Sequence, residues 1–468
     1  MPKDNIYDVI LTHRLPVSRG AKPIDEFLEL YLNEYIISLK KALLRTEECS
    51  LRKECYNLLS EKIPVITELC NDIHKVFKYY DTANMKLLYE HFSSMMKKIE
   101  GFLFVENIGN AGHESFKTCY RIRAGKEHYS RLDMFHIPFN KRHLIKSYRY
   151  SIPGYPCLYL STGLELCWFE CGMPKEFCYS SFNFELSDTE RVKLINFAIT
   201  PVDLVSSVHL SYLNYPENCD LIDAFIVKYL ATFPLRVACS IEVFNRDAAF
   251  VPEYIFPQQL LLWIRENECF DGIAYRTSSA FEKAREWNYI NIVMPAKELE
   301  NGYCKKLTKL FTVSEPVKVE MRNIIKNHDD QIEKVREFTG RLEQKYYHGY
   351  SLYPYREILS LCRSFLLFCH LLITDAYENA EAIYQAMDTL NLFSYLIADN
   401  DKAVKEKAIV DGKRFFYGID EIILAQEFDS TIDDFLKNVK PALFEFWSYV
   451  ARISSDAPFD HSSYKHVT

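Results

Sequence analysis

Apolar side chains recur every three or four residues over the N-terminal part of the chain. The stretch from Ile24 to Leu44 has this spacing, which is typical of one face of an amphipathic helix. Its apolar positions are Phe27, Leu28, Tyr31, Tyr35, Leu39 and Leu43. Similar spacing continues from Val65 to Tyr89. The first hundred residues are therefore predicted to be helical.

The C-terminal part, from about Val319 onward, has the same period. It is clearest in three segments: "EKVREFTGRLEQKY", "REILSLCRSFLLFCHLLI" and "DDFLKNVKPALFEFWSYVARI". Each one places apolar residues on a single helical face, with charged residues between them. A second helical region is predicted here.

The middle of the chain differs, because short apolar runs alternate with turn formers. Helices are expected at 163–172 and 255–267. The predicted strands are "TCYRIR" (118–123), "PCLYLS" (156–161), "YSSFNFEL" (179–186), "VKLINFAI" (192–199), "LRVACSI" (235–241), "DGIAYRT" (271–277) and "YINIVMP" (289–295). The pattern predicts an α+β protein of three regions, with helices at 1–112, a mixed domain at 113–300 and helices at 301–468.

Composition limits the class of protein further. The chain has 468 residues, of which 48% are hydrophobic, so it can bury a sizeable core. A net charge of -8 argues against binding of nucleic acid by the whole chain. The 14 cysteines are unclustered, and no signal peptide or membrane helix is recognised, so we expect a cytoplasmic protein with reduced thiols. A Walker A loop and a GxGxxG loop are both absent from the sequence.

Four stretches of the middle region combine polar residues with the ends of predicted strands: "CYRIR", "RYSIPGYPCLYLS", "LCWFECG" and "DGIAYRTSSA". Within the third, Glu170 shares a helical face with Leu166 and Cys167, where an unpaired carboxylate would be costly. A salt bridge to Arg121 or Arg149 would satisfy it structurally. That arrangement would bring the same residues together as a ligand pocket would.

These stretches resemble the RES family, named for its Arg, Glu and Ser, over roughly residues 115–297. The most specific match is "MFHIPFNKRHLIKSYRYSIPGYPCLYLSTGLELCWFECG", with an Arg-aromatic pair, a Pro-Gly turn, an "LYL" strand and a helix that carries Glu. Further matches are "YIFPQQLLLWIREN" and "DGIAYRTSSA" followed by "NYINIVMP". The resemblance implies a central domain related to the ADP-ribosyltransferases, flanked by the two helical regions.

The resemblance also implies an activity, the cleavage of the nicotinamide-ribose bond of NAD by phosphate or by water. Carried over by motif, the catalytic residues are Glu170, Arg121 and the family serine. We place this serine at Ser278, with Thr277 as the competing alignment and Ser279 beside them. Residues implied to bind NAD are Arg121, Arg149, Tyr159 and Thr277. Arginine suits this role because it grips a diphosphate with paired hydrogen bonds.

The implied reaction needs no metal and no bound cofactor, with NAD as substrate and inorganic phosphate as the co-substrate of a phosphorolysis. Contexts that the resemblance suggests are a toxin restrained by an antitoxin or another regulatory protein, or an effector of antiphage defence. We also expect a homo-oligomer, with no membrane and no nucleic-acid partner. Two alternatives stay open: an ADP-ribosyltransferase acting on a macromolecule, and an inactive RES-like scaffold whose helical ends do the work.

Other signals are weaker. The basic cluster Lys141-Arg142-His143 is interpreted as a solvated loop, with phosphate binding as the alternative. Arg363 and His370, seven residues apart on a predicted helix, resemble the Arg-to-His motif of HEPN ribonucleases, a spacing that also arises by chance. Cys167, Cys171 and Cys178 lack a CxxC pair, so we interpret them as buried thiols and not as zinc ligands.

Overall fold

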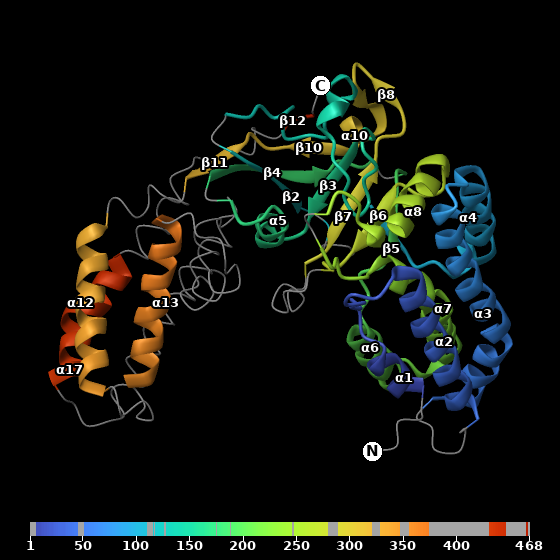
Figure 1. The fold of residues 1–468 in the computed structure, drawn as a ribbon, viewed down its shortest axis with the longest axis horizontal. Helices are drawn as coiled ribbons and strands as arrows, with labels where there is room; N and C mark the ends of the chain where they lie inside the picture. The colour runs from blue at the N-terminus through green and yellow to red at the C-terminus, as the bar shows by residue number, and fades with distance from the viewer. Residues whose placement is uncertain are drawn as a thin grey trace.

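The structure is a computed structural model, and the fold is read from the larger part of the chain. The described residues are 6–44, 51–109, 116, 118–125, 128–174, 176–187, 189–245, 248–278, 289–320, 328–346, 355–373, 430–445 and 465–466. They form an α+β protein around one mixed sheet, with helices on either side of it along the long axis of the molecule (Figure 1).

The sheet has ten strands in the order β1-β5-β6-β7-β3-β2-β4-β10-β12, with β11 also paired to β4. Only β5 and β6 run parallel among these pairs. The strand bounds are β1 Val105–Ile108, β2 Thr118–Ala124, β3 Cys157–Ser161, β4 Glu176–Phe184, β5 Val192–Asn196, β6 Gly272–Tyr275, β7 Asn291–Pro295, β10 Phe311–Val313, β11 Val317–Glu320 and β12 Lys465–His466. A separate hairpin pairs β8 (Leu299–Glu300) with β9 (Tyr303–Cys304).

The sheet is nearly divided between β2 and β3. β3 pairs with β7 along its whole length, and β2 pairs with β4 along its whole length. The register that joins β2 to β3 is a single pair, Tyr120 with Ser161. Beyond this pair β2 and β3 are not paired, and we call this break between the two strands the division of the sheet. The candidate residues lie near it.

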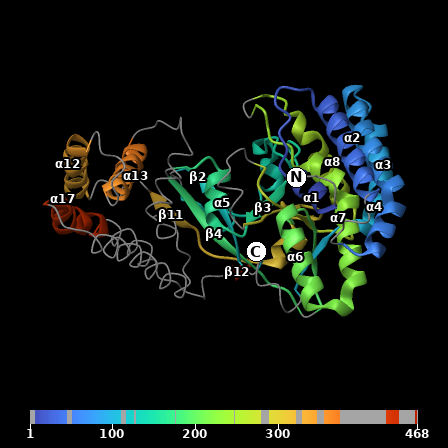
Figure 2. The ribbon, with the colours of Figure 1, turned by 90° about the horizontal axis from the view of Figure 1, so that it is seen from below.

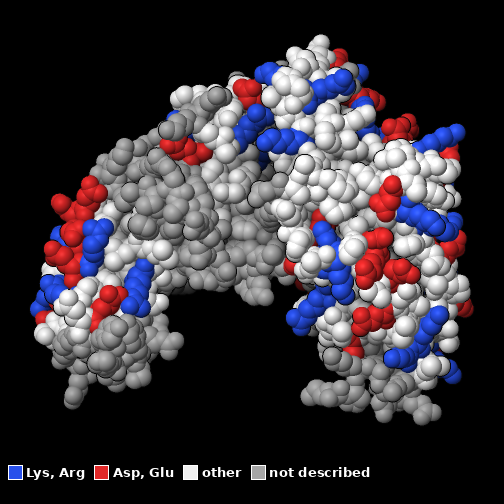
Figure 3. All heavy atoms as spheres, in the orientation of Figure 1, with Lys and Arg blue, Asp and Glu red and all other residues white. Residues whose placement is uncertain are grey.

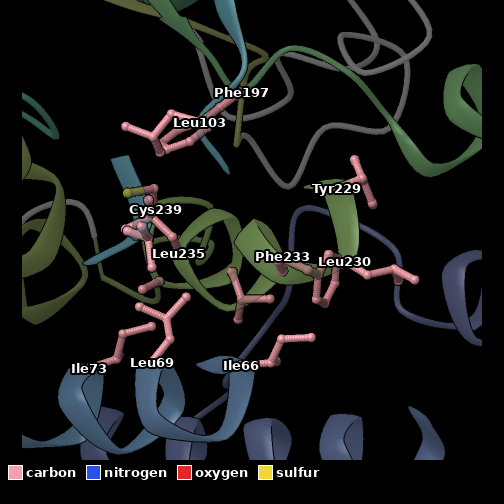
Figure 4. Packing of buried hydrophobic residues seen from close by; sticks show 14 of the residues in the cluster. Ile66, Leu69, Ile73, Leu103, Phe197, Tyr229, Leu230, Phe233, Leu235 and Cys239 are labelled. Carbon is pink, nitrogen blue, oxygen red and sulfur yellow. The ribbon is translucent and has the colours of Figure 1, made fainter. Parts of the chain in front are cut away.

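Seven helices form one unit against the β1-β5-β6-β7-β3 half of the sheet. They are α1 Ile6–Thr12, α2 Ile24–Leu43, α3 Lys53–Asp81, α4 Met85–Ile99, α6 Pro201–Asn214, α7 Cys219–Cys239 and α8 Ile255–Glu266. Their side chains share one hydrophobic cluster with β5, β6 and β7. Ile66, Leu69 and Ile73 of α3 point toward Leu230 and Leu235 of α7 (Figure 4).

The N-terminal helices share this core with the sheet, and β1, which belongs to the sheet, lies before the predicted boundary at residue 112. On the other side, β10, β11 and β12 lie beyond the predicted boundary at residue 300 and still belong to the sheet. The short helix α10 (Lys305–Leu310) precedes β10.

The C-terminal helices stand apart from the seven-helix unit (Figure 1). They are α12 Asp329–Tyr346, α13 Tyr355–Ile373 and α17 Ser430–Asp434, which continues into a π-helical turn at Phe435–Val439. Their apolar faces belong to a second cluster that also includes residues of α5 (Leu164–Glu170), β2 and β4. No helix in the described ranges is both long enough and apolar enough to cross a membrane.

Most predicted elements of the middle region are confirmed, including six of the seven strands and the helices α5 and α8. The strand predicted at "LRVACSI" is wrong, because residues 235–239 end the helix α7. The last eleven residues of this helix, Tyr229 to Cys239, are buried on all sides. A short run that is apolar all round has the same pattern in a buried helix and in a buried strand, so periodicity could not separate them.

Surface charge is mixed on the face shown in Figure 3, where Lys and Arg lie among Asp and Glu over the N-terminal helices. The described surface there does not present one sign of charge over a large area. Selective recognition of an anion on this face would therefore depend on local geometry around individual cationic side chains.

Gly272 offers a test of the strand packing. A Cβ at this position would lie 2.4 Å from the backbone oxygen of Val293 on β7, closer than atoms can approach. We expect Gly272→Ala to lower the free energy of unfolding by about 1 to 3 kcal/mol. Urea denaturation measures this, with Gly101→Ala as the control because its Cβ would meet no atom within 4 Å. Equal stability of the two variants would contradict the β6–β7 packing.

Candidate functional site

Glu170 is the last residue of α5, and its carboxylate is held by neutral donors from two other elements. Thr277, just after β6, donates its hydroxyl to Oε1 of Glu170 at 2.6 Å. Asn291, at the start of β7, donates Nδ2 to the same oxygen at 3.3 Å. Thr277 and Asn291 are buried, whereas Glu170 is exposed. The carboxylate is thereby fixed on a rigid support while remaining open to a ligand.

The position of α5 depends on a close approach at its N-terminus. A Cβ on Gly163, the residue before the helix, would overlap the ring of Tyr289. Trp168 donates its indole N–H to the carbonyl of Pro174 at 2.9 Å, which fixes the other end. The helix packs on β2 and β3, as Figure 2 shows from below. These contacts explain why Glu170 meets Thr277 and Asn291.

Arg121 lies on β2, beside the division of the sheet. Its Nη1 is buried and has no hydrogen-bond partner among the described residues. Burial and the nearby cation Arg123 lower the pKa of Arg121 to about 10, an effect partly offset by the Cys171 and Cys167 thiols and the Tyr159 hydroxyl. At neutral pH the guanidinium is still charged, so a half-buried cation stands here without a counter-ion in the described structure.

Side chains alternate between the two faces of a strand, so Arg121 lies on the face of β2 opposite to Ile122. Ile122 packs in the second hydrophobic cluster, which includes residues of α5. The charge of Arg121 is nonetheless close enough to affect the pKa of Cys167 on α5 and of Cys171, the residue after this helix. This proximity is possible because β2 and β3 separate beyond Tyr120. The guanidinium is thus a neighbour of the Glu170 end of α5, although the two side chains form no ion pair in the described structure.

Tyr159 lies on β3 and faces Tyr275 of β6. Its hydroxyl donates to Oγ of Ser151 at 3.2 Å, and burial raises its pKa well above the usual range, with Cys157 and Tyr275 adding to the effect. Burial and the Glu170 carboxylate raise the pKa of Tyr275 as well. Both phenols are therefore neutral, and Tyr275 lies near enough to the Glu170 carboxylate for its pKa to respond to that charge.

Arg149 is not at the end of a strand facing a ligand. It lies in the turn between Tyr148 and Ser151, which form an isolated bridge. Its guanidinium donates to the carbonyls of Cys239 at 3.1 Å and Ile241 at 2.8 Å. Two of its five N–H donors thus tie this turn to the end of α7.

The structure also distinguishes between the adjacent residues proposed for the family serine. Thr277 contacts Glu170, whereas Ser278 is half-buried with no side-chain contact to Glu170 in the described structure. Ser279 lies outside the described residues. Of these adjacent residues, Thr277 is the one that donates a hydrogen bond to the Glu170 carboxylate in the described structure.

Asn291 and Tyr275 were missed by the sequence analysis. Asn291 is a buried amide at the start of the otherwise apolar strand "NIVMP", and a polar residue in such a place usually has a specific partner. This signal was readable from the sequence. The partner was not, because Glu170 lies 121 residues earlier in the chain.

The weaker signals fall outside this site. Lys141, Arg142 and His143 are exposed, and the last two border an open pocket of about 460 Å³ together with Ile145, Pro153, Gly154 and Tyr155. Arg363 forms an ion pair with Glu343 of α12 at 2.7 Å. The side chain of His370 lies outside the described residues, so the paired HEPN-like arrangement is not part of the described site.

The fold and the site together define an α+β protein with a divided mixed sheet and a carboxylate-bearing candidate site near the division. The chain is similar to a protein of Bacillus subtilis (strain 168) that is named "Putative toxin YopC", with 31% identity over 314 residues that cover 65% of this chain and 68% of that protein. The chain therefore belongs to the same family as this Bacillus protein. No family model matches the chain, and no solved structure matches it.

His136, an electrostatic neighbour of Arg121, provides a pH test of this region. Its ring is fully buried, Nε2 accepts from the N–H of Cys304 at 2.9 Å, and Nδ1 lies 3.0 Å from the carbonyl of Ile137, so the neutral form is required. Burial lowers its pKa to about 4 from 6.5. The unfolded chain binds this proton more readily, so stability is lost as pH falls from about 6.5 to about 4.

The loss from this group is on the order of 3 kcal/mol. We expect His136→Gln, whose side-chain oxygen can still accept from Cys304, to show a shallower fall in the free energy of unfolding between pH 7 and pH 4.5. The exposed His143→Gln variant serves as the control and should follow the unmodified chain. An identical pH dependence in all three proteins would show that His136 is not buried in the neutral form.

Proposed function

We propose that the chain is a toxin that cleaves the nicotinamide-ribose bond of NAD. The observation that carries this proposal is the carboxylate of Glu170, fixed by Thr277 and Asn291 and open to a ligand. The sequence resemblance to the RES family names Glu170, and Thr277 as the competing position of the family serine, independently of the geometry. The name of the Bacillus relative supports the toxic outcome, because a cell deprived of NAD cannot sustain its redox metabolism.

The chemistry fits the surroundings of Glu170. Nicotinamide leaves from a positively charged ring nitrogen, so departure needs no proton, and the ribose left behind has oxocarbenium character. A carboxylate beside it stabilises this charge in the transition state. Thr277 and Asn291 donate to Oε1, which leaves Oε2 for the ribose. Because both supports are buried, the carboxylate is held in place before the substrate arrives.

Arg121 supplies the second element of the proposal. A guanidinium with an unpartnered nitrogen suits the diphosphate of NAD, since charge-assisted hydrogen bonds would compensate its burial. Tyr159 and Tyr275 would border the nicotinamide or the ribose. Arg149 acts at a distance in this scheme, because its bonds to Cys239 and Ile241 hold the turn that carries Ser151, the partner of Tyr159.

The removal of the charge of Glu170 tests the proposal directly. We expect Glu170→Gln to lower NAD turnover by at least about a hundredfold, since the amide keeps the shape but cannot stabilise the cation. Glu266→Gln is the matched control, because Glu266 is likewise the exposed last residue of a helix, α8. The products of NAD, with and without inorganic phosphate, are identified by mass spectrometry.

Nicotinamide with phosphorylated ADP-ribose would identify phosphate as the acceptor, and free ADP-ribose would identify water. ADP-ribose attached to protein or nucleic acid would indicate a transferase instead. Full activity of Glu170→Gln would refute the role of this carboxylate.

The hydroxyl at residue 277 is a second test. Thr277→Val keeps the side-chain shape and removes the donor to Glu170, so we expect kcat to fall roughly tenfold or more, in line with the loss of a hydrogen bond to a charged group. Thr277→Ser should retain activity, and the activity of Ser278→Ala should remain near that of the unmodified chain. The opposite order, with Ser278→Ala inactive and Thr277→Val active, would return the role to Ser278.

A further inference from the structure

Two buried polar atoms beside the division of the sheet lack hydrogen-bond partners in the described structure. They are Nη1 of Arg121 on β2 and Oγ of Ser180 on β4. Ser180 is completely buried. Burial of a hydroxyl without a partner costs about 1 to 3 kcal/mol, and an unpaired charge costs more. Native proteins rarely retain such groups unless a ligand or a water completes them.

The two atoms belong to directly opposed residues. Arg121 pairs with Ser180 in the antiparallel register of β2 and β4, so the two side chains leave the same face of the sheet. Opposed residues have Cβ atoms about 5 Å apart. Each group can donate a hydrogen bond, and within the described chain neither atom uses the other as a partner.

A second cation lies beside this pair. Arg123, next on the same face, also lowers the pKa of Arg121. Arg123 has compensation of its own, because its guanidinium lies over the ring of Tyr129 and its charge is near Asp133. Arg121 has no ion-pair partner among the described residues. The pair therefore offers a positive charge and a hydroxyl donor without a nearby acceptor, which is the requirement for binding an oxyanion.

We propose that Arg121 and Ser180 form a phosphate-binding site, in which the guanidinium and the hydroxyl donate to two oxygens of one phosphate group. The choice of phosphate over other oxyanions rests on the proposed function, whose substrate carries a diphosphate and whose reaction admits inorganic phosphate. Ser180 is then a ligand-binding residue that no pattern in the sequence indicated.

The test uses the full chain and measures thermal stability, which needs no enzymatic turnover. The probes are inorganic phosphate and ADP-ribose, each titrated separately in buffer free of other oxyanions. A ligand that binds the folded state raises the melting temperature, and the rise grows with the logarithm of the ligand concentration relative to its Kd. We expect Ser180→Ala to weaken binding about tenfold or more, the effect of losing one hydrogen bond to a charged group.

Ser180→Ala should fold normally, because it removes a buried hydroxyl that has no partner in the ligand-free chain. Its melting temperature without ligand should equal or exceed that of the unmodified chain. Ser181→Ala is the matched control, since Ser181 is the next buried serine of β4 and lies on the other face. This control should bind both probes like the unmodified chain.

Stabilisation by inorganic phosphate that depends on Ser180 would identify a site for the free anion. Stabilisation by ADP-ribose alone, with the same dependence, would identify a site for the phosphates of the dinucleotide. Equal binding by Ser180→Ala and the unmodified chain would overturn the inference, as would stabilisation by neither probe, which is the result expected if a fixed water fills the space. In that case a loss of NAD turnover in Glu170→Gln would still support the proposed function. The proposed function and the phosphate site can therefore fail independently of each other.

Discussion

The single pairing of β2 with β3 at Tyr120 and Ser161 is the constraint on which the candidate site depends. It keeps the two halves of the sheet in one body and lets them separate immediately beyond it. Strands that stay paired fill the space between them with backbone hydrogen bonds. Where they diverge, side chains border the opening instead. The division thus gives a β2 cation, Arg121, access to the surroundings of α5 and β3.

Three arginines near the sheet show how differently one residue type can be accommodated. Arg236 is almost completely buried, but the rings of Phe104, Phe197 and Tyr229 lie 4.9 to 5.3 Å from its guanidinium, and the carbonyl of Asn196 accepts from it. Arg149 is satisfied by two carbonyls. Arg121 has no comparable compensation in the described structure. Arg236 and Arg149 thus stabilise the fold, and Arg121 is suited to binding a ligand.

The helical N-terminal part contributes to the same core as the sheet. One hydrophobic cluster extends from Ile6 to Val293, so burial of apolar surface couples the first helices to β5, β6 and β7. Arg149 extends this coupling by linking the end of α7 to the turn before β3. The N-terminal helices are therefore part of the support for Tyr159 and Glu170, although they contribute no residue to the candidate site.

The sequence by itself determined the class of fold and most of its elements. Period-two and period-3.6 patterns are local properties, so the strands around Arg121, Tyr159 and Tyr275 and the helix that carries Glu170 could be predicted from a few neighbouring residues. The same patterns could not distinguish the end of α7 from a strand, because a fully buried segment is apolar on every side. The RES-like motifs named Arg121, Arg149, Tyr159 and Glu170 from their order along the chain, and they placed the family serine at Ser278 with Thr277 as the competing alignment.

Only the tertiary structure decided how these residues meet. Glu170 accepts from Thr277 and Asn291, more than a hundred residues away, instead of forming the salt bridge expected with Arg121 or Arg149. The guanidinium of Arg149 donates to backbone carbonyls, and Ser180 lies opposite Arg121 in the register of β2 and β4. Pairings of this kind depend on strand order and register, which are set by the packing of the whole core. A local pattern specifies which face a side chain occupies but not what lies across from it.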